Sequence, residues 1–132
     1  MRMAFFETLE QLAEADNRIQ LVVGDVGYGA VSSFCKRFPS RFLNAGIAEQ
    51  HMIGLATGMA LSGKIVFVYS LANFPVLRCL EQIRNDVCYH KANVKIVSGG
   101  AGLSYGSLGM THHATEDMAV MRATPGMVVV AP

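Results

Sequence analysis

Residues 48–69 read AEQHMIGLATGMALSGKIVFVY, which is a helical pattern followed at once by a strand pattern. At helical spacing, Glu49 shares one face of a predicted helix over 48–61 with four apolar residues: Met52, Ile53, Ala56 and Ala60. The run IVFVY at 65–69 is rich in β-branched and aromatic residues, as in a strand buried on both faces. This stretch therefore predicts the repeating unit of an α/β fold.

The same unit recurs along the chain. Further helices are predicted over 3–15, 73–89 and 115–122, and further strands over 19–23, 94–97 and 127–130. Strands separated by helices pair in parallel, so we expect an α/β fold with an open, mostly parallel sheet and helices on both faces. Ligands of such sheets bind beyond the carboxyl ends of the strands, which here lead into 24–29, 70–73 and 98–113.

Composition limits the possible functions. The 132 residues suit one domain spanning 1–132, and the strand pattern at its end, with no helix after it, predicts a domain truncated at its C-terminal end. A net charge of +1 without a basic run disfavours nucleic acid and anionic membranes as partners. Glu7 interrupts the stretch where a signal peptide needs an apolar core, so a cytoplasmic location with reduced cysteines is expected.

Glu49 is the first candidate for chemistry. A carboxyl group on an apolar helix face either pairs with a donor or holds a proton, and such a group suits proton transfer. A glutamate in the first turn of a helix also complements the helix dipole and can simply cap the helix. Position alone leaves both interpretations open.

The loop GDVGYG at 24–29 resembles a phosphate-binding loop, but its spacing matches neither the dinucleotide fingerprint nor the P-loop. Its glycines also suit a tight turn, with Asp25 bonded to a backbone amide.

A second polar group, Thr111-His112-His113 followed by Glu116 and Asp117, raises the question of a metal site. Adjacent histidines project in different directions, and the acidic residues suit the start of a helix. We therefore predict no metal ligands in this chain and expect one histidine to reach a ligand.

Phe74 and Pro75 open the predicted helix over 73–89, just past the end of a strand. Phe74 is either part of the core or a platform for a planar ring. Gly54 and Gly58 suggest close approach of another helix, which could belong to a second subunit.

Three motifs stand in order along the chain: RFLNAGIAEQ at 41–50, EQIRND at 81–86 and GMTHH at 109–113, followed by VVVAP at 128–132. Together they resemble the pyrimidine-binding domain of the transketolase family over nearly the whole chain, and most of all the separately encoded C-terminal half of split transketolases. The resemblance implies a thiamine diphosphate-binding fold of the pyrimidine-domain type. It also implies a role in carbohydrate metabolism, in a transferase that moves a two-carbon ketol unit between sugar phosphates.

The resemblance also implies roles for single residues. Glu49 matches the glutamate that hydrogen-bonds N1′ of the cofactor's aminopyrimidine and so promotes ionisation of the thiazolium. Phe74 matches the aromatic residue that stacks on the pyrimidine, and Leu71 and Leu77 stand where many transketolases have further aromatic residues. His112 matches the histidine of the Gly-x-Thr-His motif, which contacts the sugar or the cofactor-bound intermediate.

Asp25 matches the acidic residue near the thiazolium and the subunit contact. Two positions depart from the family: Leu108 replaces an aspartate of many transketolases, and Gly100 replaces a histidine. We therefore expect a selectivity other than the usual one for pentose phosphates.

The family's diphosphate-binding domain and its Gly-Asp-Gly metal motif are absent from this chain. The resemblance thus implies that Mg²⁺ is bound by a partner, the N-terminal transketolase subunit, within a homo- or hetero-oligomer. Three alternatives stay open: a 1-deoxyxylulose-5-phosphate synthase, the β subunit of a 2-oxoacid dehydrogenase, and a noncatalytic assembly module or fragment.

Overall fold

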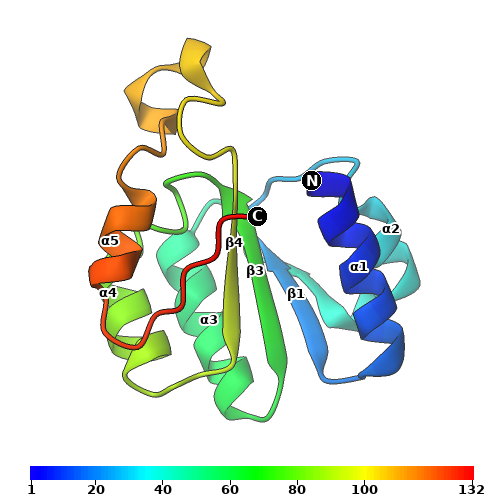
Figure 1. The fold of residues 1–132 in the computed structure, drawn as a ribbon. Helices are drawn as coiled ribbons and strands as arrows, with labels where there is room; N and C mark the ends of the chain where they lie inside the picture. Colours follow the sequence, from blue (N-terminus) through cyan, green and yellow to red (C-terminus); the bar gives the residue numbers. More distant parts are fainter.

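A four-stranded, all-parallel sheet forms the centre of the molecule in this computed structural model, which describes residues 1–132 (Figure 1). The strand order is β2-β1-β3-β4. The strands are β1 (Ile19–Val23), β2 (Phe42–Asn44), β3 (Ile65–Leu71) and β4 (Val94–Gly99). In the central register Ile19 lies opposite Ile65, and Val66 lies opposite Val94. The predicted open α/β sheet is confirmed.

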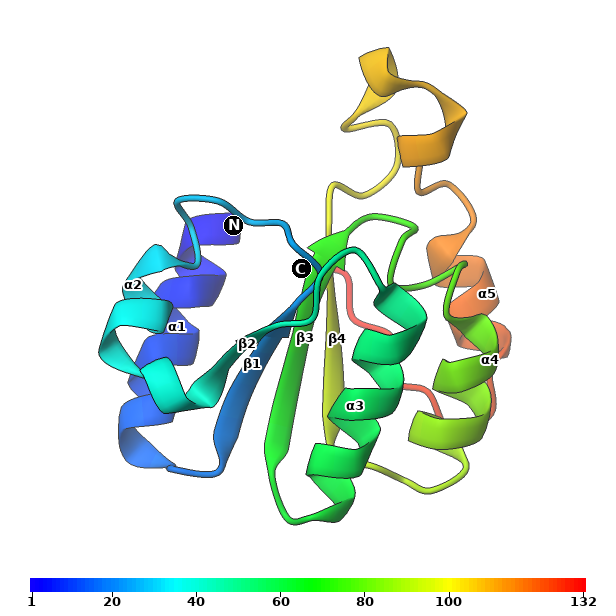
Figure 2. The same cartoon turned by 180° about the vertical axis from the view of Figure 1, so that it is seen from behind.

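Helices cover both faces of this sheet (Figures 1 and 2). The α-helices are α1 (Arg2–Ala15), α2 (Ser32–Arg37), α3 (Glu49–Leu61), α4 (Leu80–Gln82) and α5 (Asp117–Ala123). A π-helix, η2 (Ile83–Cys88), continues α4, and single 3-10 turns form η1 (Pro39–Arg41), η3 (Gly106–Leu108) and η4 (Met110–His112). Helices α1 and α2 lie on one face, and α3, α4 and α5 lie on the other.

The continuous apolar runs of the strands are explained by two cores, one on each face. Val22 of β1 packs with α3, whereas its neighbours Leu21 and Val23 pack with α1 and α2. All five residues of β1 are buried. Side chains of a strand alternate between faces, so a strand covered on both sides needs apolar residues at every position.

The carboxyl ends of β1, β3 and β4 meet at one edge of the sheet, as the parallel arrangement requires. Beyond β4, residues 99–114 project from this edge (Figures 1 and 2). The projecting segment contains η3 and η4 and is closed by an antiparallel bridge between Gly102 and Ala114. This edge is where the sequence predicts ligand binding.

The predicted strand over 127–130 is wrong. Met127 and Val129 pack against the core beside α3, while Val128 and Val130 are exposed. The alternation is that of a strand, but the backbone pairs with no strand of the sheet. Without a ladder of hydrogen bonds, a β-branched run does not form a strand.

The continuous helix predicted over 73–89 is also wrong. Residues 73–79 form turns, and regular helix begins only at Leu80. Ala72 has a left-handed backbone, with φ of 33°, which helical residues do not adopt. Pro75 has no amide hydrogen to donate to a helical hydrogen bond, so turns form here and the regular helix starts later. The prediction omits α2 and β2, and α5 begins at Asp117, not at residue 115. No helix of the structure combines the length and apolar character needed to cross a membrane.

Candidate active site

Glu49 is the first residue of α3, and its side chain is almost completely buried, with 3% exposed. The preceding Gly46 has φ of 74°, which lets the chain turn from β2 into the helix. Gly24, at the end of β1, lies against the carboxyl side chain: a Cβ there would be 3.7 Å from Cγ of Glu49. The face predicted for Glu49 is therefore confirmed.

Glu49 does not cap its helix through a backbone amide. Its carboxyl group instead binds Arg78, whose Nη1 donates a hydrogen bond of 2.7 Å to Oε2. The same guanidinium lies over the ring of Phe74, with 4.7 Å from Cζ to the centroid. The side chain of Arg78 is 47% exposed, so the pair closes the outer side of the buried carboxyl group.

His112 reaches the same place from the projecting segment. Its ring contacts Phe74 edge-on, with 5.1 Å between centroids and 67° between planes. Thr111 Oγ1 lies 2.9 Å from Nδ1 of His112, and the ring of Tyr105 lies 6.4 Å away on centroids. Glu49, Phe74 and His112 therefore come together from the loops that follow three different strands.

Arg78 and Tyr105 are missed by the sequence argument. Arg78 lies four residues after Phe74, but one arginine in a turn gives no pattern that distinguishes it from a solvated side chain. The contact between α3 and residue 78 becomes visible only in the folded chain, where Gln50 Nε2 also donates to the carbonyl oxygen of Arg78 at 3.1 Å.

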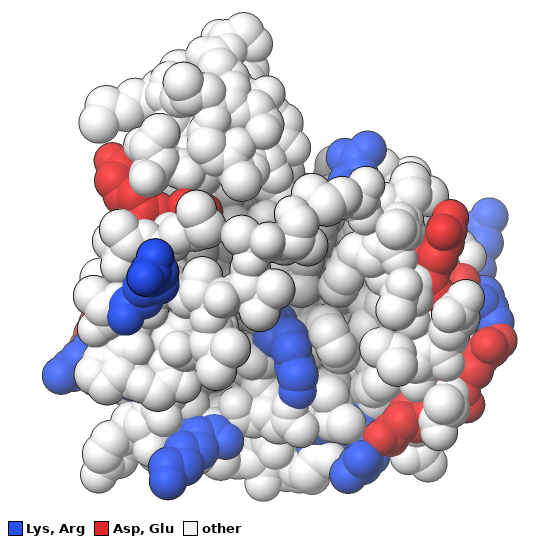
Figure 3. All heavy atoms as spheres, viewed as in Figure 1, with Lys and Arg blue, Asp and Glu red and all other residues white.

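The two leucines of the prediction occupy different positions. Leu71 ends β3 half-buried, and its carbonyl oxygen accepts a hydrogen bond from the amide of Phe74 at 2.9 Å. Leu77 lines a cavity of about 490 Å³ next to the site, together with Asn73, Met110, His113, Thr115 and Glu116. The projecting segment above this cavity carries no Lys, Arg, Asp or Glu and stands out as uncharged surface in Figure 3.

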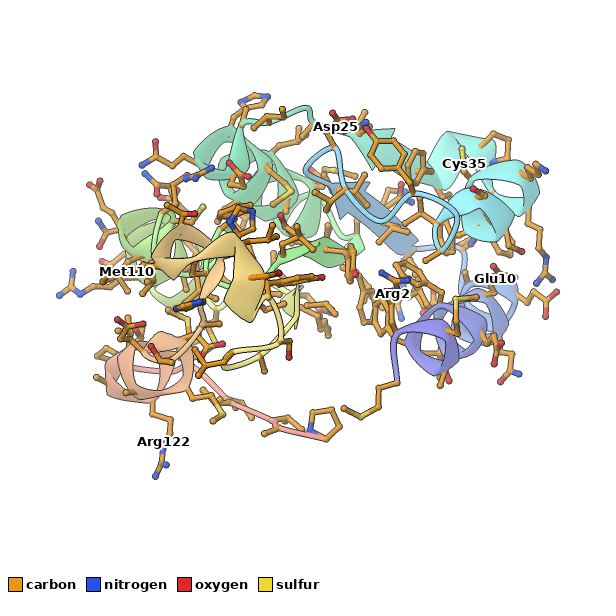
Figure 4. The ribbon with its side chains drawn as sticks, turned by 90° about the horizontal axis from the view of Figure 1, so that it is seen from above. Arg2, Glu10, Asp25, Cys35, Met110 and Arg122 are labelled. Atoms are coloured by element: carbon orange, nitrogen blue, oxygen red, sulfur yellow. The ribbon has the colours of Figure 1, made fainter.

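Asp25 does not join this cluster. It has a left-handed backbone, with φ of 54°, and in a view onto the carboxyl ends of the strands it lies apart from the loop that carries Met110 (Figure 4). Its carboxylate accepts from Asn44 Nδ2 at 2.9 Å, and Asn44 Oδ1 accepts from the amides of Asp25 and Gly46 at 3.0 Å each. A further hydrogen bond to Asp25 raises the pKa of Tyr28.

Three buried side-chain oxygens lack a hydrogen-bond partner within the chain: Ser70 Oγ, Asn73 Oδ1 and Gln82 Oε1. Ser70 Oγ lies near Glu49, because a Cβ at Gly24 would be 3.5 Å from Ser70 Oγ and 3.7 Å from Cγ of Glu49. Asn73 precedes Phe74 and lines the cavity that Leu77 also lines. Buried oxygens without hydrogen bonds are rare in native proteins and mark places where a ligand or water binds. Burial, and then the nearby charge of Glu49, raise the pKa of the Cys79 thiol to about 12, so this thiol stays protonated and inert as a nucleophile.

In residues 1–132 no three His, Cys, Asp or Glu side chains are placed to hold a metal ion. The two adjacent histidines bind different partners: His112 contacts Thr111 and Phe74, whereas Nε2 of His113 lies 3.2 Å from the carbonyl oxygen of Gly106.

Comparison with known proteins identifies the domain. The family model described as the transketolase pyrimidine-binding domain matches residues 1–132. The chain belongs to the transketolase pyrimidine-binding domain family. It is 47% identical, over its whole length, to a protein of Methanocaldococcus jannaschii provisionally named as a transketolase C-terminal section, and covers 42% of that protein.

This transketolase pyrimidine-binding domain is also 45% identical, over 99% of its length, to one of the subunits of the apulose-4-phosphate transketolase of Phocaeicola vulgatus, and covers 42% of that protein. A solved structure described as a split gene transketolase, inactive beta4 tetramer, superimposes with a TM-score of 0.81 at 41% identity, covering 94% of this chain and 40% of that one. The domain thus spans about two fifths of the length of these relatives.

Proposed function

We propose that this chain supplies the pyrimidine-binding half of the active site in a split, thiamine diphosphate-dependent transketolase. The enzyme transfers a two-carbon ketol unit between sugar phosphates or related sugars. The observation that carries the proposal is the buried carboxyl group of Glu49 at the start of α3, beside the ring of Phe74. The family membership of the whole chain supports it.

The donor set fits the aminopyrimidine of this cofactor. Glu49 has one carboxyl oxygen without a partner in the chain, and Ser70 adds an unpaired buried oxygen nearby. In the proposal Glu49 holds and shares a proton at N1′, and Phe74 offers an apolar ring face to the planar heterocycle. When bound, the cofactor supplies the thiazolium carbon that carries the two-carbon unit.

His112 and Asp25 have supporting roles in this proposal. His112 is half-buried against Phe74 and can donate hydrogen bonds to hydroxyl or carbonyl oxygens of the sugar. Asp25 is held by Asn44 beside the loop into α3. In the proposal it lies on the thiazolium side, near the subunit contact. In the proposal Leu71 and Leu77 stand where many transketolases have further aromatic residues, which makes the pyrimidine site less aromatic.

A partner subunit that binds the diphosphate and its Mg²⁺ is part of the proposal. The solved relative is described as an inactive beta4 tetramer, and two relatives are named as a transketolase C-terminal section and as one subunit of a transketolase. We expect this chain to be inactive alone and active in the cytoplasm with an N-terminal, diphosphate-binding subunit.

The test is Glu49→Gln in the complex of this chain with its co-purified partner. Loss of the ionisable carboxyl group should lower turnover at least about a hundredfold, the lower end of the effect of a general acid–base group. Glu81→Gln, the same change at an exposed position of α4, is the matched control and should leave turnover unchanged. Ketol transfer is measured with a panel of sugar phosphates, and circular dichroism checks the fold.

Turnover of Glu49→Gln near that of the unmodified complex would refute the proposal. A second panel, of 2-oxoacid donors, separates the enzyme alternatives. Turnover with 2-oxoacid donors, but not with sugar phosphate donors, would indicate a deoxyxylulose phosphate synthase or a dehydrogenase β subunit. A complex that forms without turnover on any substrate would indicate a noncatalytic assembly module.

A further inference from the structure

Three contacts converge on Arg78, a residue to which the proposed function gives no role. Its guanidinium donates to Glu49 Oε2 at 2.7 Å and covers the ring of Phe74 at 4.7 Å. Its backbone carbonyl accepts from Gln50 Nε2 at 3.1 Å. Gln50 follows Glu49 in α3, so both the main chain and the side chain of Arg78 are attached to the start of this helix.

The ion pair is strongly asymmetric in burial. The side chain of Glu49 is 3% exposed and that of Arg78 is 47% exposed. A carboxylate that is removed from water needs a charged or hydrogen-bonding partner, and Arg78 is the partner that the chain supplies. The guanidinium also lies over the Phe74 ring, 4.7 Å from Cζ to the centroid, so a cation–π contact adds to the ion pair in holding it beside Glu49.

Only one carboxyl oxygen is used in this pairing. Oε2 accepts from Arg78, and Oε1 has no hydrogen-bond partner in the chain. A single proton-sharing contact to a planar heterocycle needs one free oxygen and a fixed carboxyl orientation. The arrangement at Glu49 provides both.

We infer that Arg78 is a positioning residue for Glu49: it binds Oε2, fixes the carboxyl group, and leaves Oε1 free for the aminopyrimidine of the cofactor. The inference rests on the proposed function of Glu49 and extends it by one residue. Arg78 acts through Glu49 and Phe74.

The experiment compares Arg78→Met, Arg78→Lys and Arg84→Met in the complex with the diphosphate-binding partner. Methionine keeps an unbranched chain over Phe74 but cannot bind Oε2, whereas lysine keeps the charge without the fork. Arg84, an exposed arginine of η2 whose side chain hydrogen-bonds only to Asn85, is the matched control. Isothermal titration with thiamine diphosphate and Mg²⁺ gives the dissociation constant, and near-ultraviolet circular dichroism reports the state of the bound aminopyrimidine.

We expect Arg78→Met to raise the dissociation constant about tenfold, equivalent to about 1.4 kcal/mol, and to change the circular dichroism of the bound cofactor. Arg78→Lys should recover part of the affinity, and Arg84→Met should match the unmodified complex. If thiamine diphosphate binds Arg78→Met as tightly as the unmodified complex, or more tightly, the inference is overturned. Arg78 would then have no effect on cofactor binding, or would compete with the cofactor for Glu49. If Arg78→Met does not fold, absence of any defect in Arg78→Lys would overturn it.

Glu49→Gln in the same titration separates this inference from the proposed function. If Glu49→Gln weakens binding and Arg78→Met does not, only the role of Arg78 fails. If neither variant changes binding, the assignment of Glu49 fails as well.

Discussion

Phe74 and His112 are in edge-to-face contact, with ring centroids 5.1 Å apart, although Phe74 follows β3 and His112 follows β4. The strands are adjacent and parallel, so their carboxyl ends bring the two loops to one place. The contact joins Phe74, the proposed platform for the pyrimidine ring, to the imidazole that is proposed to meet the sugar.

The first prediction concerns this platform. Phe74→Leu removes the ring that contacts both Arg78 and His112, and an aromatic contact contributes about 0.5–1.5 kcal/mol beyond its buried area. We expect thiamine diphosphate to bind the reconstituted complex several-fold more weakly, as measured by isothermal titration. Phe38→Leu is the matched control, because Phe38 packs in the core beside α1 and α2, on the opposite face of the sheet. Equal affinities for the two variants would contradict the platform role.

The second prediction concerns the base of the projecting segment. Gly100 has φ of 87°, and a Cβ there would lie 2.1 Å from Cε2 of Tyr105. Gly102 has φ of 60° with no atom within 4 Å of its Cβ position, so Gly102→Ala measures backbone strain alone. We expect Gly102→Ala to cost about 1 kcal/mol of unfolding free energy and Gly100→Ala to cost about 1 kcal/mol more, because it also displaces Tyr105.

Urea denaturation of the isolated chain measures these costs. In the double variant Gly100→Ala, Tyr105→Ala, the added cost of Gly100→Ala should fall to that of Gly102→Ala. A Gly100→Ala variant as stable as Gly102→Ala would show that Tyr105 moves away freely. The ring of Tyr105 occupies the space where a side chain at position 100 would lie.

The third prediction concerns alkaline pH. Burial raises the pKa of Cys79 from 9.0 to about 12, so the native state keeps a proton that the unfolded state releases. The stabilisation is therefore complete below pH 9 and is lost progressively as the pH rises to about 12. The unfolding free energy should fall across this window, and its slope should be smaller in Cys79→Ala.

Urea denaturation at several pH values gives these slopes. Burial also raises the pKa of Tyr69, so some alkaline slope should remain in Cys79→Ala. Cys35→Ala, at a half-buried cysteine, is the control. Identical slopes for the unmodified chain and for Cys79→Ala would contradict the assignment of this effect to Cys79.

Helices and strands are predicted correctly in this chain wherever the spacing of apolar residues matches the buried face of the element. The helix over 48–61 and the strand over 65–69 are found within two residues of their predicted ends, because each covers a face of the core with a clear period. The prediction fails at 127–130, where β-branched residues have no strand to pair with, and at 73–79, where turns precede the short α4. The strand β2 has only three residues, too few to show a period.

The residues of the candidate site also fall into two groups, those that the sequence predicts and those that it does not. Glu49, Phe74 and His112 are identified from motifs, and the fold brings them together. Arg78 and Tyr105 are invisible in the sequence, because their roles depend on which side chains they meet across the sheet edge. Asp25 shows the converse: the resemblance to the family points to it, but in the structure its side chain binds Asn44 and forms no hydrogen bond with Glu49.

By itself, the sequence determined the alternation of helices and strands, the parallel sheet and the inward face of Glu49, since these follow from the spacing of apolar residues along a few turns or strands. Only the tertiary structure decided that Arg78 binds Glu49 over the ring of Phe74, and that Tyr105 fills the space at Gly100. Those contacts join residues from separate loops, and the geometry of such contacts is set by packing of the whole sheet edge, which no local pattern encodes.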